Sequence, residues 1–277
     1  MLLKLFKPLW GHQGSLEEAV RQAVEAGFDG IEGPAPEDKN ERREFGASMK
    51  SAGLSYIAEV CTAGGYVPER NASVSDHIRS LESGIGRSLD LEPLFVTTLA
   101  GCDAWDFSQH IRFFTRALEV AVANAVPLSV ETHRSRSTFN PWITRDILRE
   151  LPALNLTCDF SHWCVVCERL IDTEPEILEL CARRARHVHA RIGYAQGPQV
   201  PDPSAPEYSA ELEAHERWWT MIWDHQEKRG MPISTMTPEF GPDGYLHHIP
   251  HTNTPVADLW TINRWMASRQ RERFSLR

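Results

Sequence analysis

The chain has 277 residues, of which 42% are hydrophobic and 24% are charged, the balance of an ordinary globular protein. Its net charge of −9 argues against nucleic acid as the natural partner, because phosphate binding needs a basic face. No stretch approaches the roughly 20 apolar residues of a membrane span, and the lysine-interrupted N-terminus does not resemble a signal peptide, so we expect no membrane association.

Short apolar runs alternate with amphipathic helical stretches along the whole chain, which predicts strands alternating with helices. Before the first helix, Ser15 and Glu18 have the spacing of a capping box, and Gly27 ends that helix. The predicted strands are 2–9, 28–32, 55–61, 93–99, 127–131, 154–160, 187–193 and 233–240. The predicted helices are 15–27, 41–51, 73–89, 108–125, 142–151, 174–184, 207–229 and 256–268.

Eight strand–helix units in 277 residues predict an α/β fold, a (β/α)8 TIM barrel, rather than an open doubly wound sheet. No GxGxxG pattern follows a predicted strand, which argues against a dinucleotide-binding fold. The chain contains no interior linker or low-complexity segment. We therefore expect one domain over residues 1–277.

The six cysteines are scattered, unlike the disulfide framework of a small secreted protein. Cys164 and Cys167 form a lone CxxC without a second pair, so we interpret them as packing thiols rather than as a zinc or redox site. This cysteine usage favours a cytoplasmic location with reduced thiols.

Polar side chains end the four apolar runs of the second half, where a barrel carries its reacting groups. These residues are Glu131, Asp159, His189 and Glu239. Three carboxylates and one imidazole suit Mn²⁺, Mg²⁺ or Co²⁺, and Zn²⁺ is also possible. His187 and His189 alternate along one strand and face the same side, so alternation alone leaves open which of them binds the ion.

This pattern resembles the sugar phosphate isomerase/epimerase family of xylose isomerase-like TIM barrels, which are relatives of ketose 3-epimerases, inosose dehydratases and, more distantly, endonuclease IV. The family pattern is a Glu ending strand five, Asp-x-x-His after strand six, His-x-His on strand seven and a Glu ending strand eight. The resemblance implies that His189 rather than His187 binds the metal, and that His162 contacts the substrate.

The chain departs from its relatives at one arginine. Ketose 3-epimerases have an arginine six residues beyond the metal histidine, where this chain has Ala195. Arg191 lies nearer and is our candidate substitute in binding the substrate. The extra metal ligands of endonuclease IV are not evident.

The resemblance implies a divalent-metal-dependent isomerase or epimerase of a sugar or keto-sugar, with Mn²⁺ as the expected ion. Glu131 and Glu239 would be the catalytic pair that transfers protons through a metal-bound enediolate. The alternative is a metal-dependent lyase or dehydratase acting on a keto-polyol or 3-keto-glycoside, which shares the same first step.

Several other polar or aromatic residues near the strand ends are candidates for contact with the substrate. Trp10 either forms the floor for a sugar ring or packs in a lid, and Glu59 either binds a hydroxyl or caps a helix. One of His133 and Arg134 is expected to face the pocket. The loop histidines, for which a solvated or intersubunit loop is favoured over a second metal site, are His247, His248 and His251.

Two other functional classes fit less well. The intact pair Glu131 and Glu239 argues against a barrel that only binds, and the acidic charge argues against hydrolysis of DNA phosphodiesters. Because no phosphate-cradling glycine pattern occurs, a non-phosphorylated small carbohydrate is the favoured substrate. Related barrels form dimers or tetramers, so a homo-oligomer is possible, with loop 197–206 and the loop histidines as the places to look for the contact.

Overall fold

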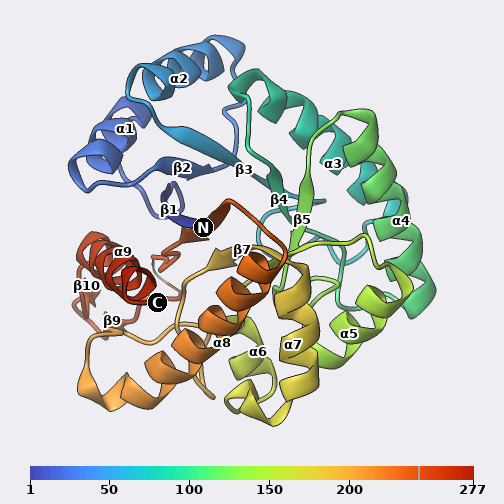
Figure 1. Ribbon diagram of the computed structural model, residues 1–277. Coiled ribbons are helices and arrows are strands. Elements are labelled where there is room, and N and C mark those ends of the chain that lie inside the picture. Colours follow the sequence, from blue (N-terminus) through green and yellow to red (C-terminus); the bar gives the residue numbers. More distant parts are fainter. Residues whose placement is uncertain (243) are drawn as a thin grey trace.

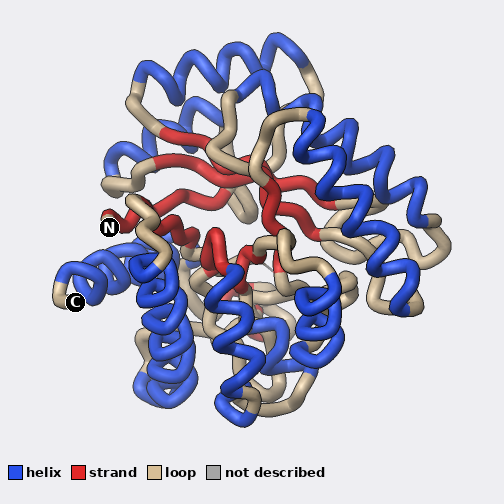
Figure 2. The backbone as a smooth tube through the Cα atoms, turned by 45° about the vertical axis from the view of Figure 1, so that its right-hand side comes forward, coloured by secondary structure: helices blue, strands red, loops and turns tan. Residues whose placement is uncertain are grey.

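The computed structural model describes residues 1–242 and 244–277 as a closed barrel of eight parallel strands with helices on its outside (Figures 1 and 2). The barrel confirms the predicted TIM fold. Its strands are β1 (Leu2–Pro8), β2 (Gly30–Gly33), β3 (Ser55–Cys61), β4 (Val96–Leu99), β5 (Leu128–Glu131), β6 (Leu156–Cys158), β7 (Ala185–His189) and β8 (Ile233–Thr237).

The helices follow the strands in the order that the sequence predicts. They are α1 (Leu16–Glu25), α2 (Lys39–Ser51), α3 (Val74–Ser88), α4 (Phe107–Ala123), α5 (Pro141–Glu150), α6 (Ser161–Val166), α7 (Pro175–Arg184), α8 (Ser209–Lys228) and α9 (Leu259–Ser275). Between β8 and α9 the chain adds a small hairpin, β9 (His248–Ile249) and β10 (Thr254–Pro255). Among the described residues, no helix is both long and apolar enough to cross a membrane.

Helix starts are determined largely by local side-chain caps. The capping box predicted at α1 is half formed, because Ser15 accepts from the backbone N–H of Glu18 while the Glu18 carboxylate pairs with Arg21. At α3 the box is complete: Ser73 and Asp76 each accept from the other's backbone N–H. Such caps satisfy N–H groups that have no partner inside the helix.

The barrel differs from the prediction mainly at its mouth. β7 ends at His189 and β8 at Thr237, each several residues earlier than predicted, so Glu239 lies in a loop. The short helix α6 was not predicted. Its start has a local cause, because the Asp159 carboxylate accepts hydrogen bonds from the backbone N–H of Ser161, at 3.0 Å, and from the Ser161 hydroxyl.

The inside of the barrel is filled by side chains rather than by solvent. Phe6, Ile57 and Phe95 form a separate apolar cluster, and the Phe6 and Phe95 rings contact His187. Outside the barrel, buried residues join strands and helices into one large core. Cys164 and Cys167 are both buried free thiols, which agrees with their interpretation as packing residues.

Candidate metal centre

Four potential ligands meet at the carboxyl edge of the barrel. Glu131 and His189 are the last residues of β5 and β7, Asp159 follows β6 directly, and Glu239 lies two residues beyond β8. One ligand atom from each side chain lies within 4.8 Å of those of the others, and all four residues are buried. The structure therefore brings together the four residues that the strand-end pattern selects.

Glu131 Oε2 has no hydrogen-bond partner, and Glu239 Oε2 and His189 Nδ1 lie close to each other without hydrogen-bond geometry. His189 Nδ1 lies 2.9 Å from Glu239 Oε2 and 3.6 Å from Glu131 Oε1. The pKa of Glu131 is raised to about 7, chiefly by burial, while the charge of His189 lowers it and the charge of Glu239 raises it. Unpaired buried carboxylate oxygens are costly, and a divalent cation relieves both their desolvation and their repulsion. These residues fit such an ion.

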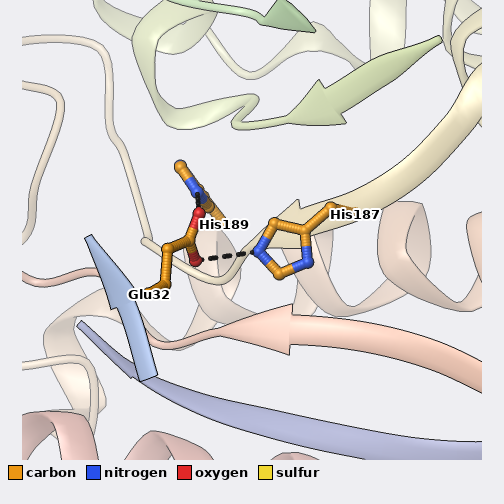
Figure 3. A group of neighbouring side chains, drawn as sticks. All are labelled: Glu32, His187 and His189. Carbon is orange, nitrogen blue, oxygen red and sulfur yellow. Dashed lines mark hydrogen bonds and ion pairs between the residues drawn. The ribbon is translucent and has the colours of Figure 1, made fainter. Parts of the chain in front are cut away.

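Glu32, a carboxylate residue on β2, contacts both histidines of β7, and these contacts distinguish the roles of the two rings (Figure 3). His187 Nε2 lies 3.0 Å from Glu32 Oε2, and the other ring nitrogen of His187 lies 2.8 Å from Thr235 Oγ1. His189 Nε2 lies 3.0 Å from Glu32 Oε1, which leaves His189 Nδ1 facing the carboxylate cluster. His187 is therefore engaged on both nitrogens, while His189 offers one nitrogen to the candidate site.

The pKa of Glu32 favours its ionised form. Burial alone would raise the pKa of Glu32, but His187 and His189 together hold it well below the usual range. A histidine that donates one N–H to a carboxylate has a fixed tautomer and orientation, as metal-binding histidines commonly do. The sequence analysis missed Glu32, although Glu32 ends the predicted second strand and satisfies the same strand-end rule.

Arg191 and His162 lie beside the four candidate ligands. The Arg191 guanidinium contacts Asp159 Oδ2, donates from Nε to Ser161 Oγ at 3.1 Å, and lies 2.6 Å from His162 Nε2. His162 Nε2 is 3.8 Å from Glu131 Oε1. Burial, reinforced by the nearby cations, lowers the pKa of His162 well below its ordinary value. His162 is therefore a neutral ring next to a fixed positive charge.

Three aromatic side chains cover the cluster. Trp10 packs against Tyr66 and Tyr245, with ring centroids 5.2 and 4.8 Å apart. Trp10 also lies against Gly241, where an added Cβ would come within 1.9 Å of the indole ring. Beneath this cover a cavity of about 10 Å³ is lined in part by Glu131 and Glu239. Trp10 thus packs in a lid, one of its two predicted roles.

Two larger cavities adjoin this lid. One, of about 390 Å³, is lined by Glu59 and Tyr66, and the other, of about 470 Å³, is lined by His133, Arg134 and Tyr245. Glu59 also lines the small central cavity. It does not cap the following helix, since Ser73 is the N-cap of α3, so that alternative is wrong.

Burial raises the pKa of Glu59 to about 8, with further contributions from Glu239 and Glu131. His133 lines the central cavity and its ring centroid is 4.0 Å from that of His162. Arg134 lines only the outer cavity, where its guanidinium lies 5.0 Å from the centroid of the Tyr245 ring. Of the two neighbours, His133 is therefore the one that faces the central cavity.

The loop histidines form no metal cluster among the described residues. His247 and His251 are exposed, and His248 bonds to Asn253 across the hairpin turn. Loop 197–206 has an internal role: buried Gln199 accepts from the N–H of Gly241 at 2.7 Å and donates to its carbonyl at 3.2 Å. Gln199 thereby fixes the segment that carries Glu239, a contact that sequence spacing does not signal.

The fold is a closed parallel barrel, and a buried group of three carboxylates and one histidine lies at its carboxyl edge. The protein is therefore a TIM barrel with a candidate metal centre. Residues 20–197 match the profile of the xylose isomerase-like TIM barrel family, and the chain belongs to this family. No curated protein matches the sequence significantly.

Solved structures share the whole fold at low sequence identity. The apo form of 3-keto-D-glucoside 4-epimerase YcjR from E. coli is 14% identical, with a TM-score of 0.63 over 98% of this chain and 99% of that one. The IolI protein with a bound zinc atom is 12% identical, with a TM-score of 0.68 over 99% of both chains. The probable 3-DHS dehydratase AsbF from Bacillus anthracis is 14% identical, with a TM-score of 0.60 over 96% and 99%. At these identities the likeness shows the fold alone.

Proposed function

We propose that the protein is a divalent-metal-dependent isomerase or epimerase that acts on a sugar or keto-sugar. The observation that carries this proposal is the pair Glu131 and Glu239, which come from opposite ends of the second half-barrel and line one buried cavity. Glu131 Oε2 has no hydrogen-bond partner, and Glu239 Oε2 lies 2.9 Å from His189 Nδ1 without hydrogen-bond geometry. Such groups are available to hold an ion and to move a proton.

Glu131, Asp159, His189 and Glu239 would hold the ion, and Mn²⁺ is the metal we expect from three oxygen donors and one nitrogen donor. The zinc atom in IolI supports a divalent cation in a barrel of this shape. When bound, such an ion polarises a substrate carbonyl and lowers the cost of removing the neighbouring proton.

The two glutamates would divide the proton transfer between them. Each glutamate has two carboxylate oxygens, so one oxygen could hold the ion while the other accepts a proton from the substrate. If one glutamate removes the proton and the other returns it to the opposite face of an enediolate, the product is an epimer. Return to the neighbouring carbon gives an aldose–ketose isomer. Neutral His162 and cationic Arg191 would orient the substrate oxygens.

The remaining lining residues would bind and enclose the substrate. His133 and Glu59 line the chamber, and Trp10 covers it together with Tyr66 and Tyr245. A cavity of about 10 Å³ is far smaller than a sugar, so part of this cover must move when the substrate enters. Reclosure would exclude water from the enediolate.

A metal-dependent lyase or dehydratase of a keto-polyol or 3-keto-glycoside is the second candidate. It begins with the same proton removal and then loses a leaving group. Glu59 favours it, because a carboxyl with a pKa of about 8 is protonated at neutral pH and could donate to a departing hydroxyl. AsbF, a probable dehydratase, shows that this fold occurs in proteins assigned such chemistry.

The test is to incubate the Mn²⁺-loaded protein in D₂O with ketoses, keto-inositols and 3-keto-glycosides, and to follow each by NMR and mass spectrometry. Deuterium at a retained carbon without loss of mass would support the isomerase. Loss of water or of an aglycone would overturn it in favour of the lyase. The Glu239→Gln protein, loaded identically, is the control for exchange that does not depend on the site.

We further propose a single domain over residues 1–277, a cytoplasmic location and a small carbohydrate substrate. The free state of the six cysteines supports a reducing compartment. The net charge of −9 disfavours nucleic acid as a partner. A homo-oligomer, either a dimer or a tetramer, remains our expectation from the family resemblance.

A further inference from the structure

A cavity of about 860 Å³ lies outside the barrel. It is bordered by the end of β1, by α1 and α9, and by the hairpin β9–β10, elements that Figure 1 shows on one side of the barrel. Trp10 is the one described residue that lines both this cavity and the central one. A volume of this size is typical of small-molecule sites.

Lys7 forms part of the cavity wall, and strand alternation explains why. Successive side chains of a strand point to opposite faces. The Phe6 ring points into the barrel, where it contacts His187, so Lys7 points outward toward α9. Lys7 is only 2% exposed, yet it carries an ammonium group.

The ammonium of Lys7 is poorly compensated. Its Nζ donates to the carbonyl of Pro8 at 3.3 Å and lies 5.3 Å from the centroid of the Trp260 ring. Among residues 1–242 and 244–277, no carboxylate forms an ion pair with it. Burial lowers the pKa of Lys7 to about 8, which reflects this lack of an anion. A buried ammonium has three N–H groups to satisfy, and burying a charge without a counterion is costly.

The other lining residues indicate which kind of anion could pair with Lys7 in this cavity. Indole and aliphatic side chains make up most of the apolar lining, including Trp10, Trp260, Leu246 and Leu259. The one carboxylate among the described lining residues, Asp258, already accepts from the backbone N–H of Thr261 at 2.7 Å as the N-cap of α9. Lys7 is the one lysine or arginine in that described lining, which also includes the imidazoles of His12 and His248. One fixed positive charge in the wall favours one negative charge on the ligand over two.

We propose that this cavity binds a small organic monocarboxylate with an apolar or aromatic body, whose carboxylate pairs with Lys7 Nζ. The apolar body would lie against Trp260 and Trp10. This site is separate from the proposed metal centre, and binding there requires neither metal nor turnover. If no carboxylate bound in this cavity, the proposed function would be unaffected. If the proposed function were wrong, carboxylate binding in this cavity would also be unaffected.

The experiment uses the full-length, metal-free protein with four probes: benzoate, phenylacetate, phenyl phosphate and benzyl alcohol. Saturation-transfer NMR detects binding and calorimetry measures Kd. We expect the two carboxylates to bind at least about tenfold more tightly than the neutral alcohol, because a charge-assisted hydrogen bond is lost in the alcohol. Tighter binding of phenyl phosphate would overturn the preference for one charge, and equal binding of acid and alcohol would overturn the role of Lys7.

Two variants locate the binding. Lys7→Met should weaken the binding of benzoate at least about tenfold. Lys50→Met, which removes an exposed lysine of α2, should leave the Kd for benzoate unchanged. If Lys7→Met does not fold, intermolecular nuclear Overhauser effects between benzoate and the indole protons of Trp260 are measured on the wild-type protein. Their absence at a saturating benzoate concentration, or benzoate affinity unchanged in a folded Lys7→Met protein, contradicts the proposal.

Discussion

The two halves of the barrel contribute differently to the candidate site. Strands β5–β8 carry all four potential ligands at their ends. Strands β1–β4 carry none of that set, but the same half supplies Glu32 behind His189, and Trp10 and Tyr66 above it. The comparison suggests that one half provides the reactive groups while the other half orients and encloses them.

The largest effect is expected at the two glutamates of the second half. Replacing Glu131 or Glu239 with Gln keeps the shape and removes the proton acceptor, so each variant should lose roughly 10²–10⁴-fold in solvent-deuterium exchange by the Mn²⁺-loaded protein. Glu59→Gln, in the first half, is the comparison and should lose much less, because Glu59 lines the cavity but is not one of the four candidate ligands. Glu41→Gln, at an exposed position of α2, is the control for a glutamate outside the site and should leave exchange unchanged. If Glu59→Gln lost as much exchange as the variants of Glu131 and Glu239, the first half would also supply a reactive group, and the division between halves would fail.

The next effect tests the supporting role of Glu32. Glu32→Gln removes the negative charge that fixes His189, and loss of such a partner typically costs about 10–100-fold in metal affinity. Calorimetry with Mn²⁺, and the visible spectrum of the Co²⁺-loaded protein, would measure affinity and geometry. Thr235→Val, which removes only the hydroxyl next to His187, should change both much less. Wild-type affinity and spectrum in Glu32→Gln would show that Glu32 serves packing alone.

Arg136 joins the two halves. It is fully buried after β5, yet it donates to the carbonyls of Thr62 at 2.6 Å, of Tyr66 at 3.1 Å and of Gly101 at 3.3 Å, all in loops of the first half. Arg136→Met would leave these carbonyls unpaired, so we expect a loss of about 3 kcal/mol in the free energy of unfolding.

Urea denaturation measures this loss. Arg134→Met, at a half-buried position two residues away, is the control and should cost under about 1 kcal/mol. Equal losses in the two variants would show that Arg136 has no special role in tying the loops together.

The same division explains what the sequence could predict. Glu131, Asp159, His189 and Glu239 could be found because each ends an apolar run and because metal ligation restricts residue type. Glu32 obeyed the same rule, but its role depends on a contact with β7, more than 150 positions away.

Tyr66, Tyr245 and Gln199 were not predicted for a related reason. They act from loops, whose contacts are set by the tertiary fold rather than by periodicity. The predicted strands extended too far at the mouth of the barrel for the same reason. There the backbone stops pairing with the neighbouring strands wherever side chains turn toward the site. Gly241 is an example of a residue whose role cannot be predicted from the sequence. Only its contact with Trp10 in the fold shows why a side chain is excluded there.

The smallest effect concerns Glu59 and pH. Its pKa is about 8 in the fold, because burial and the nearby Glu239 and Glu131 raise it, against roughly 4.3 in an unfolded chain. Between these values the folded protein holds a proton that the unfolded chain has released, so the stability of the metal-free protein should fall as pH rises from about 5 to about 8.

Glu59→Gln removes this contribution, and its free energy of unfolding, measured in urea at several pH values, should decline less steeply than that of the wild type. An identical slope in both proteins would mean that Glu59 titrates normally in the fold. It would then be ionised at neutral pH, and the first half of the barrel would add to the charge at the site instead of supplying a neutral carboxyl beside it. Glu59 could then no longer serve as the proton donor that favours the lyase.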